Sequence, residues 1–226
     1  MSLGGIAAIV SLIARKRLDE TLSNEASEAK ESGSLIALLK QHWKSFFLVV
    51  GYTAAGSLCF YIITVYSKTY LTNIGIDSKV VGYIMTVSLF VFMLSQPVFG
   101  IISDKIGRRA AMITFTLSML LFIYPVMVIG MRYFAQSPII IALLLIFLMM
   151  LLSFYTSISG LVKAEMFPPH LRALGVGVSY AIGNAIFGGS APSVALQFKA
   201  SGAENAFFYL CHGCIVYLLI LLLPAA

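Results

Sequence analysis

Five polar side chains recur at helical spacing inside one long apolar run of the sequence. Thr53, Ser57, Tyr61, Thr64 and Lys68 follow one another at intervals of four, four, three and four residues. At 3.6 residues per turn they share one narrow face of a helix. Polar groups at membrane depth usually face a bundle interior or a watery cavity, so we interpret this face as a cavity wall. Hydrogen bonding between helices by Ser and Thr is the alternative interpretation.

A second set of polar residues lies in a later apolar run. Ser153, Thr156 and Ser157 share one side of the predicted helix, and Tyr155 lies on a neighbouring side. Asn184 is a further candidate because a buried amide needs hydrogen-bond partners, and it either lines the cavity or ties two helices together. None of the nine carboxylates falls at mid-membrane depth in the predicted topology. We therefore expect no buried acid in this chain that carries protons.

The composition of the chain places these residues in a membrane protein. Hydrophobic residues make up 60% of the sequence and charged residues 11%, whereas soluble domains carry about 25% charged residues. Apolar runs of about 20 residues recur, which is the length that crosses a bilayer as a helix. We predict an all-α integral membrane protein with six transmembrane helices. The predicted spans are 45–67, 80–102, 110–130, 138–162, 173–196 and 206–223.

Lys and Arg are divided unevenly between the two sides of this topology. Eleven lie on the side that holds the polar segment 15–44 and the loop at 103–109, and four lie on the other side. Positive charge accumulates in cytoplasmic loops, so the first side is assigned to the cytoplasm. The same rule accounts for the net charge of +6. We predict a lipid bilayer as the surroundings, no nucleic-acid partner, no cofactor and no metal site.

Two charged loops on the cytoplasmic side carry a specific order of residues. The first has the order Gly-x-x-x-Asp-Lys-x-Gly-Arg-Arg, formed by Gly100, Asp104, Lys105, Gly107, Arg108 and Arg109. The second, two predicted spans later, contains Glu165, Pro169, Arg172 and Gly175. Together these loops resemble the signature of the major facilitator superfamily of transporters.

The resemblance implies the C-terminal half of a twelve-helix major facilitator fold. Residues 1–14 would end the sixth helix, residues 15–44 would form the central cytoplasmic loop, and residues 45–226 would form a six-helix bundle. Residues 15–210 are similar to the metabolite:proton symporter branch of bacterial inner membranes. This similarity implies proton-coupled import of a small organic acid, with α-ketoglutarate or a related carboxylate expected and proline/betaine, citrate or shikimate as alternatives. The missing N-terminal half would supply the main substrate cation and the proton-coupling acid.

The same resemblance implies a latch that closes the cytoplasmic side of the transporter. Arg108 and Arg109 are expected to reach Glu165 or the carbonyl groups at a helix C-terminus, where positive charge is favoured. Arg172 is expected to pair with Asp104. These contacts would hold the gate closed and break when the protein turns inward.

Several other residues carry expectations of their own. Gly100 is expected to let two helices cross closely, and Lys163 to be a gate residue or a snorkelling charge. Ser159 and His212 would be the reactive pair if the chain were an intramembrane protease. A membrane subunit that does not transport is another alternative. We predict a transporter rather than an enzyme.

Overall fold

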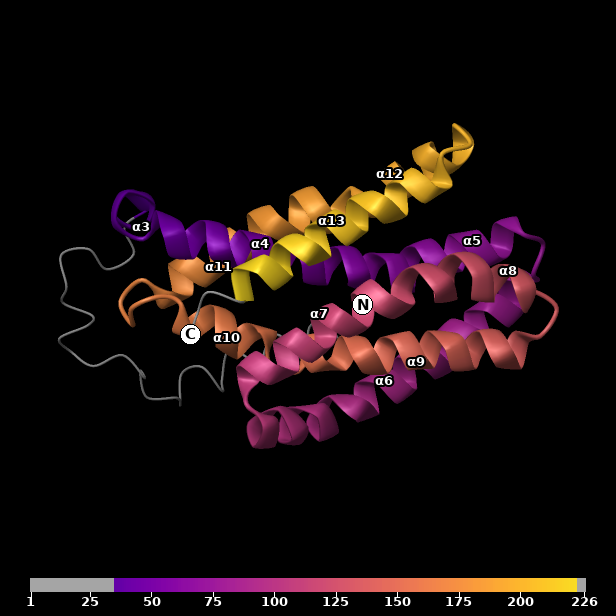
Figure 1. Ribbon diagram of the computed structural model, residues 1–226, viewed down its shortest axis with the longest axis horizontal. Coiled ribbons are helices and arrows are strands. Elements are labelled where there is room, and N and C mark those ends of the chain that lie inside the picture. The colour runs from indigo at the N-terminus through magenta and orange to yellow at the C-terminus, as the bar shows by residue number, and fades with distance from the viewer. Residues whose placement is uncertain (1–34, 223–226) are drawn as a thin grey trace, which may run out of the picture.

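The described chain is a bundle of long helices that run side by side along one axis (Figure 1). The computed structural model describes residues 35–222, and the regular elements in that range are all helices. The predicted helix end at 1–14 and the predicted loop through residue 34 lie outside the described residues. In chain order the elements are α3 (Leu35–Gln41), α4 (Trp43–Tyr61), η1 (Ile62–Tyr66), α5 (Ser67–Asn73), α6 (Ser78–Ile106), α7 (Arg108–Tyr124), η2 (Pro125–Gly130), α8 (Met131–Tyr133), α9 (Pro138–Thr156), α10 (Ser159–Glu165), α11 (Arg172–Gly183), η3 (Asn184–Gly189), α12 (Ala191–Ala200) and α13 (Glu204–Leu222), where η marks a π-helix.

Four helical stretches among the described residues are long and apolar enough to cross a membrane. They are Trp43–Asn73, Ser78–Ile106, Arg108–Tyr133 and Pro138–Glu165, and each contains one of the first four predicted spans. The fifth predicted span falls on α11, η3 and α12, and the sixth overlaps α13. For these last two segments, crossing of the membrane stays a prediction.

Local sequence signals set the ends of these helices. Asp77 precedes α6, and its carboxylate accepts hydrogen bonds from the backbone N–H groups of Lys79 at 2.8 Å and Val80 at 3.4 Å. Such a cap satisfies N–H groups that have no partner inside the helix. Gly107 ends α6 with a φ of +90°, which is a conformation that glycine adopts without steric cost. The chain turns there directly into α7.

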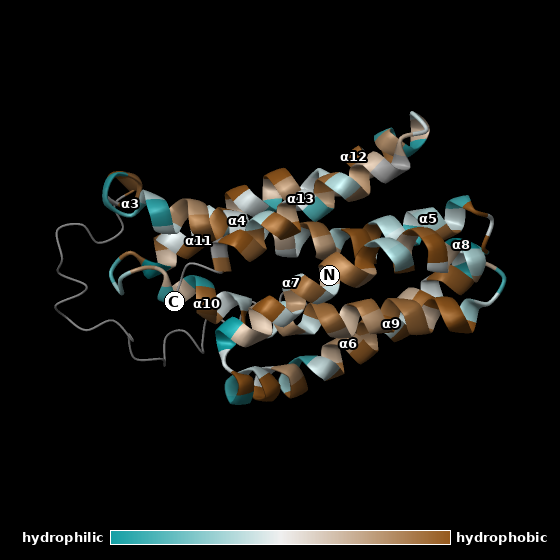
Figure 2. Ribbon diagram, in the orientation of Figure 1, coloured by the Kyte–Doolittle hydropathy of each residue, from teal (hydrophilic) through white to brown (hydrophobic). Residues whose placement is uncertain are grey.

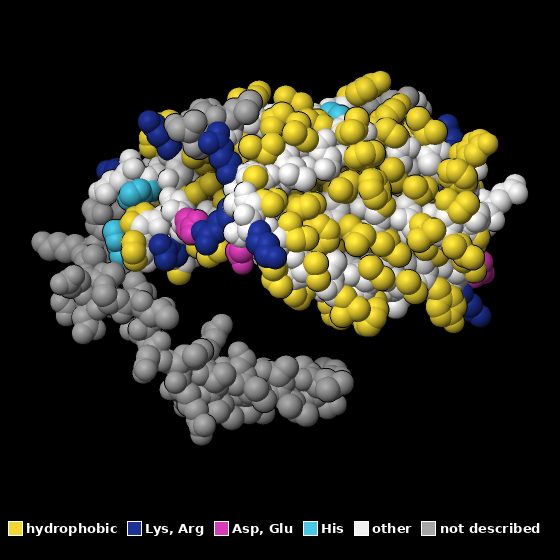
Figure 3. Space-filling view, turned by 60° about the horizontal axis from the view of Figure 1, so that its bottom comes forward, with side chains coloured by type: hydrophobic (Ala, Val, Ile, Leu, Met, Phe, Trp, Pro, Cys, Tyr) yellow, Lys and Arg dark blue, Asp and Glu magenta, His cyan; other side chains and the backbone are white. Residues whose placement is uncertain are grey.

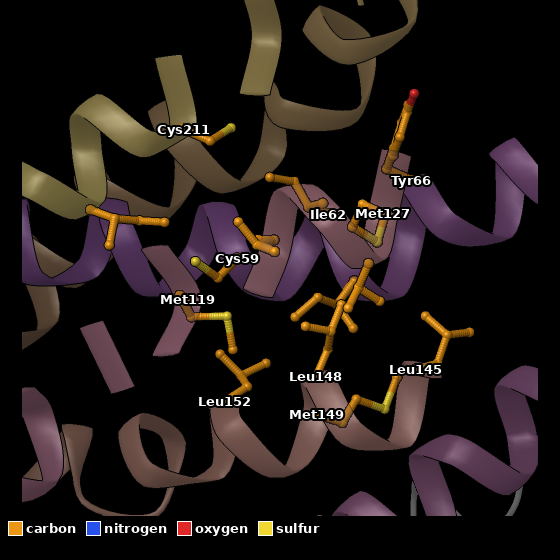
Figure 4. Packing of buried hydrophobic residues seen from close by; sticks show 14 of the residues in the cluster. Cys59, Ile62, Tyr66, Met119, Met127, Leu145, Leu148, Met149, Leu152 and Cys211 are labelled. Carbon is orange, nitrogen blue, oxygen red and sulfur yellow. The ribbon is translucent and has the colours of Figure 1, made fainter. Parts of the chain in front are cut away.

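Helix α4 occupies the centre of the bundle. It packs against α11, η3 and α13, while α9 packs against both α6 and α7. The stretch Trp43–Asn73 is accordingly the most buried of the four, and Ser78–Ile106 is the least buried. Apolar and sulfur-containing side chains fill the space where these helices converge (Figure 4). Among them are Cys59, Ile62, Met119, Leu148 and Cys211.

The outside of the bundle is apolar along its length and charged toward its ends. Hydrophobic residues dominate the long helices in Figure 2, and hydrophobic side chains cover most of the face seen in Figure 3. Large apolar side chains such as Phe90, Met93 and Leu143 are exposed. Contiguous apolar surface of this extent suits contact with lipid rather than water.

Part of the predicted central loop is helical. Helix α3 lies within the range 15–44, and its Leu38 is fully buried in a small cluster with Phe46, Val49 and Phe167. This cluster joins the segment before α4 to the loop before α11. The end of the predicted loop is therefore packed against the bundle.

Candidate functional site

A cavity of about 250 Å³ lies between α4, α11 and the junction of α9 with α10. Its wall combines an ammonium group, a carboxamide, tyrosine rings and hydroxyl groups, with no carboxylate among the lining residues. The lining residues are Gly56, Ser57, Phe60, Tyr61, Tyr155, Thr156, Ser159, Lys163, Tyr180 and Asn184. The cavity wall thus carries polar groups on a mostly apolar surface, and the charge that lines it is positive.

The predicted stripe on α4 reaches the cavity only in its middle. Ser57 and Tyr61 line the wall. Thr53 is fully buried and lies under Gly183 of α11, where an added Cβ would come within 2.9 Å of the Thr53 Cβ. Close packing of α11 therefore covers the inner end of the stripe, and Thr53 is a contact between helices rather than a cavity residue.

The outer part of the stripe also turns away from the cavity. Thr64 donates a hydrogen bond to the backbone carbonyl of Phe60 at 2.6 Å, and Lys68 is exposed in α5. The π-helix η1 begins at Ile62 and has a wider turn than an α-helix,. The spacing of 3.6 residues therefore no longer describes which residues share a face beyond that point.

Asn184 both lines the cavity and ties two helices together. Its side-chain oxygen accepts a hydrogen bond from the Ser57 hydroxyl at 2.9 Å, which links η3 to α4. A Cβ added at Gly188 would come within 2.7 Å of that oxygen and 2.8 Å of the Tyr61 ring. The missing side chain at Gly188 therefore leaves room for both groups. The sequence left two roles open for Asn184, lining the cavity or tying two helices together, and the structure gives it both.

The polar residues of α9 are divided between the cavity and the contact with α6. Thr156 lines the cavity and donates a hydrogen bond to the Gln96 side-chain oxygen at 2.9 Å. Ser153 is fully buried instead; it accepts a hydrogen bond from the Gln96 amide nitrogen at 3.1 Å and lies 2.9 Å from the Ser95 hydroxyl. The Ser157 hydroxyl is buried with no hydrogen-bond partner among the described residues. Neither Ser153 nor Ser157 belongs to the cavity lining.

The helical stretch is broken between α9 and α10. Helix α9 ends at Thr156, and Ile158 has φ −121° and ψ −6° before α10 begins at Ser159. The helical phase is interrupted at Ile158, so a single continuous helix does not describe this region. The interruption brings Tyr155 and Lys163 to the same cavity wall.

Tyr155 is held firmly by its neighbours. Its hydroxyl donates a hydrogen bond to the backbone carbonyl of Tyr52 at 2.9 Å, and its ring centroid lies 5.0 Å from that of Phe115. Gly56 lies against the ring so closely that an added Cβ would be 2.1 Å from two ring carbons. The Tyr155 ring is therefore a fixed part of the wall.

Lys163 brings the positive charge to the cavity. Its side chain is only 3% exposed, so the expectation that Lys163 is a snorkelling charge is wrong. The ammonium nitrogen lies 5.3 Å from the ring centroid of Tyr155 and 4.8 Å from that of Tyr180. Both distances are typical of cation–π contacts. Tyr180 and Gln96 were not singled out from the sequence, because each stands alone among apolar or small neighbours.

An ion pair joins the two charged loops. Arg108, at the start of α7, pairs with Glu165 at the end of α10. The pair expected between Asp104 and Arg172 is not formed among the described residues. The two residues stand on helices with different neighbours. Asp104 lies in α6, which packs against α9 and α7, whereas Arg172 begins α11, which packs against α4.

The other residues of the first loop lie at the surface. Lys105, Gly107 and Arg109 are exposed, and Arg109 lines the same surface pocket as Glu165. A Cβ added at Gly100 would meet nothing within 4 Å. The close helix crossing expected at Gly100 is therefore not made within the described part of the chain.

The geometry also argues against Ser159 and His212 as the reactive pair of an intramembrane protease. The His212 ring nitrogens lie 2.8 Å from the backbone carbonyl oxygen of Phe208 and 3.1 Å from that of Leu120. Ser159 lines the cavity, and His212 is not among the lining residues. The expectation of a reactive pair is wrong, because both ring nitrogens already face backbone carbonyls.

An apolar helical bundle with helices of membrane-spanning length and a cation-bearing cavity defines the class of integral membrane proteins. The family model of the Major Facilitator Superfamily matches residues 48–226. The chain belongs to this family, which confirms the predicted all-α membrane fold, and the relatives that it matches are named as permeases, symporters and transporters rather than enzymes. The count of six membrane-spanning helices and the assignment to the C-terminal half stay predictions. Membership also agrees with the predicted location, because a relative from Escherichia coli K12 that is 26% identical over 87% of this chain is named as an inner membrane metabolite transport protein.

Several bacterial transporters resemble the chain. It is 49% identical to the alpha-ketoglutarate permease of Escherichia coli K12 over 92% of this chain and 48% of the permease. It is 28% identical to a citrate-proton symporter of Salmonella typhi over 86% of this chain and 45% of that protein. It is 24% identical to a proline/betaine transporter of Salmonella typhimurium over 87% of this chain and 41% of that protein. The chain thus spans about half the length of these curated relatives. No solved structure matches the chain.

Proposed function

We propose that the chain is the C-terminal half of a proton-coupled symporter that imports α-ketoglutarate or a closely related carboxylate by alternating access. The observation that carries the proposal is the 49% identity to the E. coli alpha-ketoglutarate permease over 92% of this chain. The cavity supports it, because an ammonium group beside neutral hydrogen-bonding groups suits a small carboxylate,. The relatives that carry citrate or proline/betaine define the alternatives within the same branch.

The proposal assigns proton coupling to an N-terminal half. The cavity lining contains no carboxylate, and the chain spans 48% of the E. coli permease. The acid that exchanges protons and a further substrate-binding cation would then face this cavity from the other half. On this proposal the chain by itself binds at most part of the substrate and does not transport.

We also propose that the charged loops form the cytoplasmic latch. The ion pair between Arg108 and Glu165 supports this role, because it joins the start of α7 to the end of α10 at the charged end of the bundle. Both side chains are about half exposed, at 40% and 51%, so the pair is weak enough to break during a transport cycle. Asp104 and Arg172 are then available to contact the other half of the transporter.

The test is uptake by the complete transporter in proteoliposomes. The chain is joined to the N-terminal half from its own gene or, as a chimera, to that of the E. coli permease. The proposal expects labelled α-ketoglutarate to accumulate when an inward proton gradient is imposed and not when a protonophore removes the gradient. Uptake of citrate or proline in its place would assign a different substrate within the branch. Failure to take up any carboxylate would refute the proposal.

A further inference from the structure

Lys163 is a buried positive charge that no described carboxylate neutralises. Its side chain is 3% exposed, and the ion pair found among residues 35–222 joins Arg108 to Glu165 instead. Burial of an unpaired charge is costly, so a buried cation in this position needs a partner. The partners that the structure provides are the rings of Tyr155 and Tyr180.

These rings leave the hydrogen-bonding capacity of the ammonium group unused. An ammonium group has three N–H donors and no acceptor, and no oxygen among the described residues accepts a hydrogen bond from Lys163. Ring faces attract the charge but do not replace an anionic acceptor. Lys163 is a lining residue of the cavity, and its ammonium nitrogen lies beside the lining residues Tyr155 and Tyr180. An anion in the cavity can therefore supply the missing acceptor.

One of the two rings beside the ammonium group is held firmly by its neighbours. Tyr155 is anchored by its hydrogen bond to the Tyr52 carbonyl at 2.9 Å and by its contact with Phe115. The neutral polar groups of the cavity include those of Ser57 and Asn184. The wall therefore offers one cationic point and separate neutral groups, an asymmetry that suits an acid with two unlike ends.

We infer that Lys163 is a substrate-binding residue that takes one carboxylate of the transported acid in a charge-assisted hydrogen bond. The inference rests on the proposed function and deepens it by naming a contact that this half makes. It replaces the expectation that Lys163 is a gate residue. The rings of Tyr155 and Tyr180 lie against the ammonium group at the cavity wall.

The test compares α-ketoglutarate with two analogues that each lack one of its carboxylates. They are 2-oxopentanoate, which lacks the distal carboxylate, and 4-oxopentanoate, which lacks the carboxylate beside the keto group. Binding to the purified complete transporter is measured by competition with labelled α-ketoglutarate, which does not require transport. The variants are Lys163→Met and Lys163→Arg. Lys199→Met is the matched control, because Lys199 also lies over a tyrosine ring, 4.2 Å from the centroid of Tyr70, but does not line the cavity.

In the wild type, the analogue that lacks the carboxylate bound by Lys163 is expected to compete with labelled α-ketoglutarate on the order of 10-fold to 100-fold more weakly than unlabelled α-ketoglutarate does. Lys163→Met is expected to weaken the binding of α-ketoglutarate by a similar factor. The variant should then bind α-ketoglutarate no more tightly than that one analogue. Lys163→Arg is expected to keep most of the preference, and Lys199→Met all of it. Loss of all binding in Lys163→Met with binding retained in Lys163→Arg also supports the inference.

Two results would overturn the inference in different ways. If Lys163→Met keeps the wild-type preference over both analogues, Lys163 does not bind a carboxylate, although the proposed function stands. If the wild type binds no carboxylate at all, the proposed function fails and the inference fails with it. A Lys163→Met protein that does not fold is replaced by Lys163→Gln, for which the same preferences are expected.

Discussion

The contact between Gly56 and Tyr155 gives the sharpest test of how the cavity wall is built. An alanine Cβ at position 56 would lie 2.1 Å from two carbons of the Tyr155 ring, whereas ordinary contact begins near 3.4 Å. The interior is close-packed, so the ring must retreat by roughly 1 Å or more. That movement breaks or lengthens the 2.9 Å hydrogen bond from Tyr155 to the Tyr52 carbonyl.

The size of the effect follows from two contributions. Overpacking of a well-packed interior costs about 1–3 kcal/mol, and the loss of one hydrogen bond costs about 1 kcal/mol. We therefore expect Gly56→Ala to lower the free energy of unfolding by about 2–4 kcal/mol. The displaced ring also enters the cavity, so binding of α-ketoglutarate should weaken in the same variant.

Thermal unfolding of the purified complete transporter, followed by far-UV circular dichroism, measures the stability. Gly82→Ala is the matched control, because a Cβ at Gly82 meets nothing within 4 Å and lies in helix α6. That substitution is expected to leave stability unchanged or to raise it slightly, through better helix propensity. Adding Tyr155→Leu to Gly56→Ala should recover part of the lost stability. If Gly56→Ala unfolds at the wild-type temperature, the close contact and the reasoning built on it are wrong.

Five further substitutions test three other contacts. Gln96→Leu and Thr156→Val should each destabilise the protein by about 1 kcal/mol. Their effects on stability should not add when the two are combined, because both remove the same hydrogen bond between Thr156 and Gln96,. Additive effects in a double-mutant cycle would contradict this. Arg108→Gln and Glu165→Gln should each change the free energy of unfolding by less than about 1 kcal/mol, with a coupling that fades as salt is added; a large coupling that salt leaves unchanged would contradict a surface ion pair. Gly175→Ala should lower the unfolding temperature, because its Cβ would lie 2.7 Å from a phenylalanine ring; an unchanged unfolding temperature would contradict that packing.

Much of the fold could be predicted from local sequence. Long apolar runs predict helices of membrane-spanning length, and the first four predicted spans each lie inside an observed apolar stretch. Signals such as Asp77 before α6 and Gly107 after it act through their immediate neighbours. The order of charged residues from Gly100 to Arg109 pointed to the superfamily, and the match of the family model confirms it.

The site could be predicted only in part, because the prediction assumed unbroken α-helices. The wide turn at η1 shifts the helical phase, so Thr64 lies outside the cavity although its spacing grouped it with the wall. Ser153 lies outside the cavity because it contacts Ser95 and Gln96 of α6. Sequence spacing also cannot say which face a neighbouring helix covers. Thr53 is buried because α11 lies against it at Gly183.

The sequence by itself determined that this is a helical membrane protein of a transporter family, because hydrophobicity, charge order and helix signals all act over a few neighbouring residues. Only the tertiary structure decided which polar groups meet. Lys163 becomes a buried charge between Tyr155 and Tyr180 because α9, α10 and α11 come together there, and those contacts join residues that are distant in the sequence. Burial and partnership are properties of the packed bundle, so the charge that local spacing placed near a surface lies in the cavity wall instead.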